Sequence, residues 1–228
     1  MAGRAREPGR RSRVLRDHLG NPRDWKRYLQ RLLSPERARW QRPQKVVAAL
    51  GLRPGQTVAE LGTGPGYFAF RLARAVGPAG HVYAVDAEPR MLALLTTRLA
   101  GSRWRNITPV LGLAHDPLLP PAACDLILLV NAYHHRRDGP GDLRRLRRAL
   151  RPRGRLVNID FDRRQTPVGP PLEHRVAREE FLRQARRAGW RPVKAFDFLP
   201  YQYGIVLGLR RNRAPGRRPP RRTDPTRR

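Results

Sequence analysis

Short apolar runs alternate with amphipathic stretches along most of this chain, and this alternation restricts its fold more than any other feature. Strands that are covered on both faces read as uninterrupted apolar runs, whereas the covering helices place an apolar side chain at every third or fourth position. A chain that alternates the two forms a mostly parallel sheet between two layers of helices. The predicted strands are 58–61, 81–85, 107–111, 126–130, 156–159, 193–198 and 205–209.

Helical spacing identifies the segments between these strands. The last two predicted strands are joined by a connection that contains Pro200 and is too short for a helical crossover, so we expect them to pair antiparallel. Residues 21–50 predict helices that pack before the sheet or over its active edge, with Trp40 either in the core or in a lid. The apolar helix faces comprise Phe68, Leu72 and Val76; Leu143, Leu146 and Leu150; and Phe181, Leu182, Ala185 and Ala188, which precede Gly189.

The two ends of the chain carry part of the net charge, and the larger part, +19, lies between them. The 228 residues carry a formal charge of +30, to which residues 1–20 contribute +4 and residues 211–228 contribute +7. Both ends lack the apolar residues that a packed core needs, so we expect disordered basic tails around one domain at residues 21–210. Arginine makes up 45 of the 48 basic residues, which fits either a solvated basic surface or tails that bind a polyanion such as RNA.

Cysteine and hydropathy exclude several classes of protein. One cysteine, Cys124, leaves no possibility of an intramolecular disulfide or a multi-cysteine metal centre, and we expect it to pack at the start of a strand. Glu173 and His174 are the obvious distant candidates for metal ligands, and we expect no metal site. Because no apolar run approaches the roughly 20 residues that cross a bilayer, we expect a soluble, cytoplasmic protein without a membrane partner.

The segment VAELGTGPGYF at residues 58–68 combines a predicted strand, an acidic residue and three alternating glycines. Glycines allow a sharp turn and a close approach of the backbone to a ligand, and the helix that follows presents free N–H groups to an anion. A dinucleotide-binding loop would have a third glycine at the position of Tyr67, and the segment lacks the lysine of a P-loop. The spacing therefore disfavours a nicotinamide-dependent oxidoreductase, which we keep as a third alternative.

A second acidic residue ends the next predicted strand. Asp86 follows Gly62 by 24 residues, where a carboxylate can accept both hydroxyl protons of a ribose. The same position is acidic in NAD-binding folds, so Asp86 indicates an adenosine ligand without identifying it. The alternative is a carboxylate that caps the next helix.

These motifs resemble the class I S-adenosylmethionine-dependent methyltransferases over residues 43–209. The segments AACDLILLVNAYHH and LRRALRPRGRLVNIDF are similar to the fourth and fifth strands of that family, with a turn at Pro152-Arg153-Gly154 before the fifth strand. The YHH after strand four resembles a bacterial type 11-like subgroup. The resemblance implies a Rossmann-like, doubly wound α/β fold with seven strands in the order 3-2-1-4-5-7-6 and a terminal antiparallel hairpin.

The resemblance also implies S-adenosylmethionine as the cofactor. The family often has an acidic residue after strand three that receives the adenine amino group, and Leu113 stands there in this chain. His115 or Asp116 could substitute, or both could be ordinary loop residues. The implied cofactor residues are Glu60, Gly62, Thr63, Gly64, Gly66, Asp86, Ala87, Asp116 and Asn131.

The acceptor side of the site is less constrained. His134 and His135 follow strand four, and one of them is our candidate for a general base or for a group that orients the acceptor. The alternative is a histidine that only caps the strand. Tyr133, Tyr201 and Tyr203 could wall the acceptor pocket or belong to the core.

We therefore expect a methyltransferase that acts on an unidentified acceptor, with a small molecule favoured. One rival is an RNA methyltransferase that uses the basic tails, and it is tested by truncating them. Another is a nucleic-acid or protein-binding module that keeps the fold without turnover, which failure to bind S-adenosylmethionine would favour.

Overall fold

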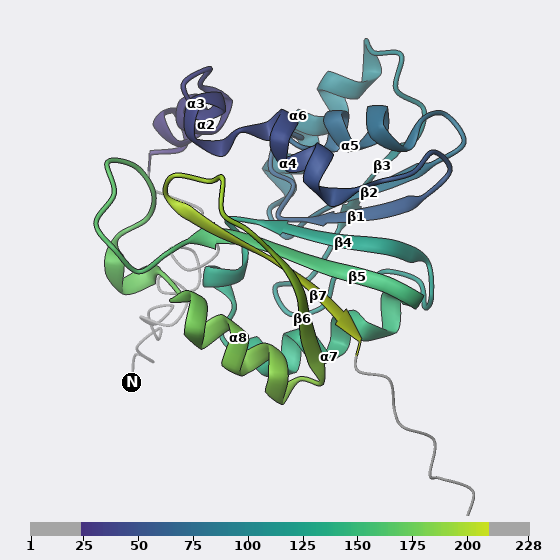
Figure 1. Cartoon of the computed structure of the whole chain (residues 1–228). Helices are drawn as coiled ribbons and strands as arrows, with labels where there is room; N and C mark the ends of the chain where they lie inside the picture. Colours follow the sequence, from purple (N-terminus) through teal and green to yellow (C-terminus); the bar gives the residue numbers. More distant parts are fainter. Residues whose placement is uncertain (1–23, 210–228) are drawn as a thin grey trace, which may run out of the picture.

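The computed structural model describes residues 24–209 and shows one seven-stranded sheet with helices on both faces (Figure 1). The strand order is β3-β2-β1-β4-β5-β7-β6, with β1 to β5 parallel and β7 antiparallel to both of its neighbours. This confirms the predicted order and the terminal hairpin. The strands are β1 Thr57–Leu61, β2 His81–Asp86, β3 Ile107–Leu111, β4 Cys124–Val130, β5 Leu150–Phe161, β6 Trp190–Phe196 and β7 Gln202–Leu209.

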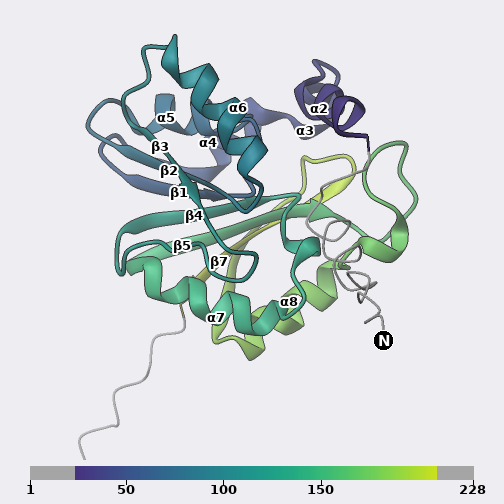
Figure 2. The same ribbon diagram turned by 180° about the vertical axis from the view of Figure 1, so that it is seen from behind.

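The helices form two layers and an N-terminal group. Helices α4, α5 and α6 cover one face of the sheet and α7 and α8 cover the other, while α2 and α3 lie beyond the carboxyl ends of the parallel strands (Figures 1 and 2). Two short 3-10 helices, η1 Tyr133–His135 and η2 Leu172–His174, complete the described part of the chain. The α-helices are α2 Trp25–Leu33, α3 Arg37–Gln41, α4 Pro43–Leu50, α5 Ala69–Val76, α6 Pro89–Ala100, α7 Gly139–Ala149 and α8 Arg178–Arg187.

Alternation of side chains divides the core between the two layers. In β1, Val58 packs toward α4 and α5, whereas Ala59 and Leu61 pack toward the layer of α7 and α8. Because both faces of the strand are buried, its sequence shows no polar alternation, as parallel strands require. The carboxyl ends of β1 and β4 lie side by side at the centre of this doubly covered sheet.

Local sequence signals set where several helices begin. Asp24, Glu88 and Asp138 each accept a hydrogen bond from a backbone N–H in the first turn of the helix that follows them. A proline stands in the first turn of α4, α6 and α7, where its missing N–H is not needed. The cap of α6 is thus Glu88 and not Asp86, which leaves the Asp86 carboxylate for another role.

The segment Pro152-Arg153-Gly154 is part of β5, so the predicted turn before that strand is wrong. Leu150 pairs with Cys124 and Arg155 already pairs with Leu126, so the residues between them bulge out of the ladder. The bulge lets the strand begin directly at the end of α7. Leu150, which we assigned to the helix face, is consequently the first residue of the strand.

Other boundaries differ by a few residues. β4 begins at Cys124, which is buried as expected, and β6 runs from Trp190 to Phe196 and not from residue 193 to 198. The Trp190 side chain at the start of β6 is fully buried, and its indole N–H donates to the Leu143 carbonyl of α7 at 3.0 Å. The two tails predicted at residues 1–20 and 211–228 lie outside the described residues, as do the proposed boundaries of the domain at 21 and 210.

Candidate functional site

The glycine loop continues directly from β1. Gly62, Gly64 and Gly66 have φ angles of +76°, +56° and +88°, which side chains with a Cβ rarely adopt. A Cβ on Gly62 would lie 2.8 Å from the Ala132 Cβ, and one on Gly66 would lie 2.7 Å from the Leu95 Cδ1. On Gly64 the nearest atom would be the Leu32 Cδ1 at 3.8 Å. Close packing thus opposes a side chain at Gly62 and Gly66, whereas a Cβ on Gly64 would only make ordinary contact with Leu32 and Met91.

Glu60 lies under this loop and is nearly inaccessible. Its side chain accepts a hydrogen bond from the Thr63 hydroxyl at 2.8 Å, and Thr63 is itself buried. Burial raises the pKa of Glu60 from 4.5 to about 8, because the carboxylate loses its hydration. No basic side chain within residues 24–209 forms an ion pair with it. Glu60 is therefore a buried carboxyl group without an ion-pair partner in the described part of the chain.

Asp86 joins the end of β2 to the glycine loop. One carboxylate oxygen accepts the Gly64 N–H at 2.8 Å, and the other accepts the Glu88 N–H at 3.0 Å. Burial raises the pKa of Asp86, and the backbone N–H donors oppose that shift. Ala87 follows it and is half-buried. Glu60, the loop and Asp86 thus form one contiguous group at the carboxyl ends of β1 and β2.

The loop after β3 starts beside this group, because the Gly112 N–H donates to the Asp86 carbonyl at 3.0 Å. Leu113 is 53% exposed and His115 is also exposed. The Asp116 carboxylate accepts the Leu118 N–H at 2.9 Å and stabilises a turn within the loop. The predicted contact of Asp116 with an adenine stays a prediction, and its visible role is in the turn.

Asn131 follows β4 in a left-handed conformation, with φ of +56°. Its amide donates to the Gln41 side-chain oxygen at 3.3 Å, and its own side-chain oxygen accepts a hydrogen bond from Gln202. Gln41 in turn donates to Gln202 at 2.6 Å. The three amides link the loop after β4 to α3 and to the start of β7. Sequence reasoning named only Asn131 of this group.

The two histidines of η1 have different surroundings. The His134 Nδ1 lies 2.8 Å from an Asp160 oxygen, and the His134 N–H donates to the other Asp160 oxygen at 3.1 Å. Only 4% of the His134 side chain and 1% of the Asp160 side chain are exposed. The His135 ring is half-buried and lies with its centroid 4.0 Å from that of His134. Asp160, which the sequence analysis did not single out, thus orients one of the two predicted histidines.

The predicted tyrosines do not share one surface. Tyr133 is 1% exposed, packs edge-on against Phe181 and donates its hydroxyl proton to Gln184. Tyr203 is also buried and stacks on Phe181 at 5.9 Å. Both rings are buried, which fits the core position that the sequence left open for them. Tyr201 is half-buried and remains a candidate.

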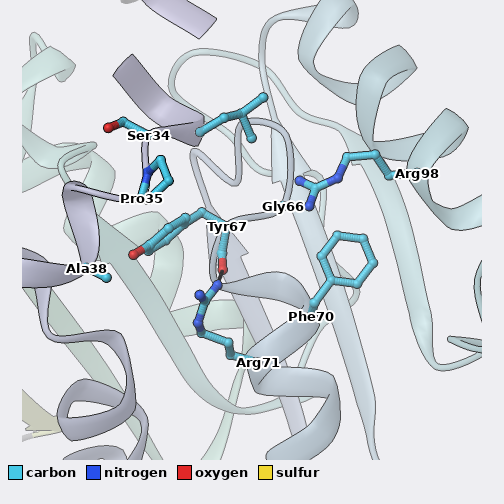
Figure 3. A pocket seen from close by; sticks show the side chains of 9 residues that line it. Ser34, Pro35, Ala38, Gly66, Tyr67, Phe70, Arg71 and Arg98 are labelled. Atoms are coloured by element: carbon cyan, nitrogen blue, oxygen red, sulfur yellow. Dashed lines mark hydrogen bonds between the residues drawn. The ribbon is translucent and has the colours of Figure 1, made fainter. Parts of the chain in front are cut away.

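A hollow of about 320 Å³ lies beside the glycine loop, between α5, α6 and the connection from α2 to α3 (Figure 3). Tyr67 reaches from the loop toward Pro35 and Ala38, while Arg71 from α5 and Arg98 from α6 line other sides of the hollow. These two arginines donate to the carbonyls of Tyr67 and Pro65, so they brace the loop itself. The Tyr67 hydroxyl has no hydrogen-bond partner in the described part of the chain.

Two negative findings apply to residues 24–209. None of their helices is long and apolar enough to span a membrane. They also contain no group of three or more His, Cys, Asp or Glu side chains with the geometry of a metal site, and Glu173 and His174 are both exposed.

Comparison with known proteins adds an independent line of evidence. Residues 58–154 match the family model of a methyltransferase domain. The chain is also 35% identical over 91 residues to a protein-L-isoaspartate O-methyltransferase from Methanothrix thermoacetophila. That match covers 40% of this chain and 40% of the relative, so the chain spans less than half of the length of that protein.

Solved structures extend the similarity beyond the matched segment. The crystal structure of a SAM-dependent methyltransferase from Aquifex aeolicus has a TM-score of 0.75 and 26% identity, and the match covers 79% of this chain and 96% of that one. A putative type 11 methyltransferase from Sulfolobus solfataricus shares the fold, with a TM-score of 0.59 and 22% identity over 69% of this chain and 86% of that one. The chain therefore contains a class I S-adenosylmethionine-dependent methyltransferase domain.

Proposed function

We propose that this protein transfers the methyl group of S-adenosylmethionine to an acceptor atom that carries a proton, and that the acceptor is a small molecule. The observation that carries the proposal is the pair formed by His134 and Asp160. The pair follows the carboxyl end of β4 and lies at the carboxyl end of β5, on the edge of the sheet that also holds the glycine loop.

The side chains at the glycine loop fit the cofactor. Its amino-acid group carries an ammonium, and Glu60 is a buried carboxyl group without an ion pair among the described residues. Its ribose needs an acceptor for two hydroxyl protons, and Asp86 ends the adjacent strand. We assign Gly62, Thr63 and Gly66 to the shape of the loop.

His134 would accept the acceptor's proton. Bound S-adenosylmethionine supplies an electrophilic methyl carbon on a sulfonium. The acceptor's lone pair would form the new bond to that carbon while the carbon–sulfur bond breaks, with the electron pair of that bond retained by the sulfur of S-adenosylhomocysteine. Because Asp160 occupies Nδ1, the nitrogen left to take the proton is Nε2. A nearly covered imidazole suits an acceptor that is held away from water.

Protein carboxyl methylation is the second candidate, since the curated relative is named for it. A carboxylate acceptor is already deprotonated at neutral pH and needs no general base. The His134–Asp160 pair therefore favours an acceptor such as a phenol, alcohol, amine or thiol. RNA as acceptor depends on the basic tails, which lie outside the described residues.

The acceptor class is tested with labelled S-adenosylmethionine and a cell extract that is fractionated into RNA, protein and metabolites. We expect the label in the metabolite fraction. Label that appears only in protein or only in RNA would overturn the small-molecule proposal and identify the rival. The absence of label in all three fractions, from a protein that binds the cofactor, would favour the non-catalytic module.

The proton acceptor is tested by substitution once an acceptor is known. His134→Ala should lower kcat by roughly 100-fold to 10,000-fold, the usual contribution of a general base. His174→Ala, on the exposed η2, is the matched control and should leave kcat unchanged. A wild-type rate in the His134 variant would contradict the proposed base, and a loss confined to His135→Ala would transfer the role to that residue.

A further inference from the structure

Arg37 is a buried cation without an acidic partner. Its side chain is on the short helix α3, and the residue is only 8% exposed. Its hydrogen bonds go to the side-chain oxygen of Gln41 at 3.4 Å and to the carbonyl of Leu32 at 3.3 Å. No Asp or Glu of residues 24–209 forms an ion pair with it. A guanidinium that loses its hydration for three long hydrogen bonds to two neutral groups is stabilised when an anion completes its surroundings.

The guanidinium of Arg37 lies over the glycine loop. Its central carbon is 3.9 Å from the centre of the ring of Tyr67, the residue that follows Gly66 in the chain. Its partner Gln41 is hydrogen-bonded to Asn131, which follows β4. Arg37 thus lies between the loop after β1 and the loop after β4, which are the two loops that border the carboxyl end of the central strand pair.

The charge of Arg37 also acts on Glu60. Burial is the main influence on the pKa of Glu60 and raises it, the Thr63 hydrogen bond lowers it, and the positive charge of Arg37 lowers it further. The two groups are close enough to interact through space without forming an ion pair. The Glu60 carboxyl group is bonded to Thr63 at the start of the loop and the Arg37 guanidinium lies over Tyr67 at its end, and the two form no ion pair.

This arrangement matches a zwitterion. We propose that Arg37 binds the carboxylate of the cofactor's amino-acid group, while Glu60 faces the ammonium on the same carbon. Helix α3 is then part of the cofactor site, and the N-terminal helices cover the bound group. The inference rests on the cofactor of the proposed function and is independent of the acceptor.

The alternative is that Arg37 only holds α2 and α3 together through Leu32 and Gln41. The two roles differ in what they demand of the ligand. A structural arginine contributes equally to every ligand that needs the closed helices, whereas a carboxylate receptor contributes only to ligands that carry the carboxylate. S-Adenosylmethionine and its decarboxylated form, S-adenosylmethioninamine, differ in this group alone.

The test measures binding of both ligands by calorimetry, without turnover, to the wild-type protein and to Arg37→Met. A charge-assisted hydrogen bond contributes roughly 1.5–3 kcal/mol, so Arg37→Met should weaken S-adenosylmethionine binding by about 10- to 100-fold. Binding of the decarboxylated ligand should change by less than about twofold, and Arg37→Lys should restore part of the lost affinity. Equal weakening of both ligands, or no weakening of either, would overturn the proposal.

Arg39→Met is the matched control on the same helix. The Arg39 side chain is 81% exposed and pairs with Glu36 at 2.7 Å, so its loss should leave the affinity for both ligands unchanged. Urea denaturation of ligand-free Arg37→Met should show no loss of stability, because the buried guanidinium is removed together with its desolvation penalty. A wild-type protein that binds S-adenosylmethionine but methylates nothing would contradict the proposed function and leave this inference intact.

Discussion

At the scale of single residues, the chemistry of the site is set by carboxyl groups in water-poor surroundings. Glu60 is 3% exposed, and burial raises its pKa to about 8. The folded, ligand-free protein therefore binds one more proton at this group than the unfolded chain does between pH 4.5 and about 8. The stability that Glu60 contributes falls as pH rises through that window. A nearby ammonium would reverse the effect by favouring the ionised carboxylate.

Proton release on cofactor binding follows from this pKa. Near pH 7, binding of S-adenosylhomocysteine should release close to one proton from Glu60, because a neutral carboxyl group becomes a carboxylate beside the ammonium. Calorimetric enthalpies in buffers of different ionisation enthalpy measure the number of protons released. Glu60→Gln should abolish the release, while Glu36→Gln, which changes an exposed carboxylate, should keep it. Undiminished release from the Glu60 variant would refute the assignment.

At the scale of elements, α3 connects the two halves of the site. Gln41 on α3 is hydrogen-bonded to Gln202 at the start of β7, and the Arg42 guanidinium donates to the Phe198 carbonyl at 2.6 Å. Trp40 packs against Phe161 at a ring distance of 5.3 Å, at the end of β5. Trp40 is half-buried, so it lies between the core and lid roles that the sequence left open. A five-residue helix is held mainly by such tertiary contacts.

The amide pair of Gln41 and Gln202 should stabilise this docking. Each single replacement by Met leaves a buried amide without its partner and should destabilise the protein by about 1–3 kcal/mol. The double variant should lose less than the sum, with a coupling energy of about 1 kcal/mol from urea denaturation. Gln56→Met, at a distant turn where Gln56 accepts the Arg53 N–H, is the control and should be additive with Gln41→Met. If the losses of stability from the Gln41 and Gln202 replacements were additive, the hydrogen bond between these side chains would not hold α3 in place.

At the scale of the whole molecule, the arginine excess has more than one use. Several body arginines donate to backbone carbonyls far away in sequence and so act as structural clamps. Arg175 alone donates to the carbonyls of Pro170, Asp162, Arg164 and Val168 and holds the segment between β5 and α8. Part of the +30 charge is therefore explained by folding and needs no polyanionic partner.

Removal of the charged ends tests whether the rest of the positive charge serves to bind RNA. Deleting residues 1–20 and 211–228 removes +11 of the formal charge. With a small-molecule acceptor, kcat/KM should stay within about twofold of the full chain. Binding of RNA by the full chain should be weak, and its dependence on salt should fall when the ends are removed, because fewer counterions are released. Loss of turnover in the truncated protein would instead support RNA as the acceptor.

Much of this protein is determined by local sequence. Apolar runs and helical spacing predicted the strands and the antiparallel pairing of the last two. They could do so because a strand that is buried on both faces is an apolar run of consecutive residues. The glycine loop was also predictable, because its three positive φ angles demand glycine at those positions. The bulge in β5 could not be predicted from local sequence, because its register depends on Cys124 in another strand.

Only the tertiary structure decided which polar groups meet. Gln41 and Gln202 are 161 positions apart, and His134 and Asp160 are 26 apart, so no local pattern connects them. The one signal for Asp160 was a carboxylate between two apolar residues, Ile159 and Phe161, and Arg37 had no signal among 48 basic residues. A buried charge is recognised by the partners it has or lacks, and those partners are brought together by packing of distant segments. The sequence by itself thus determined the fold and the cofactor loop, while the structure decided which side chains complete the site around it.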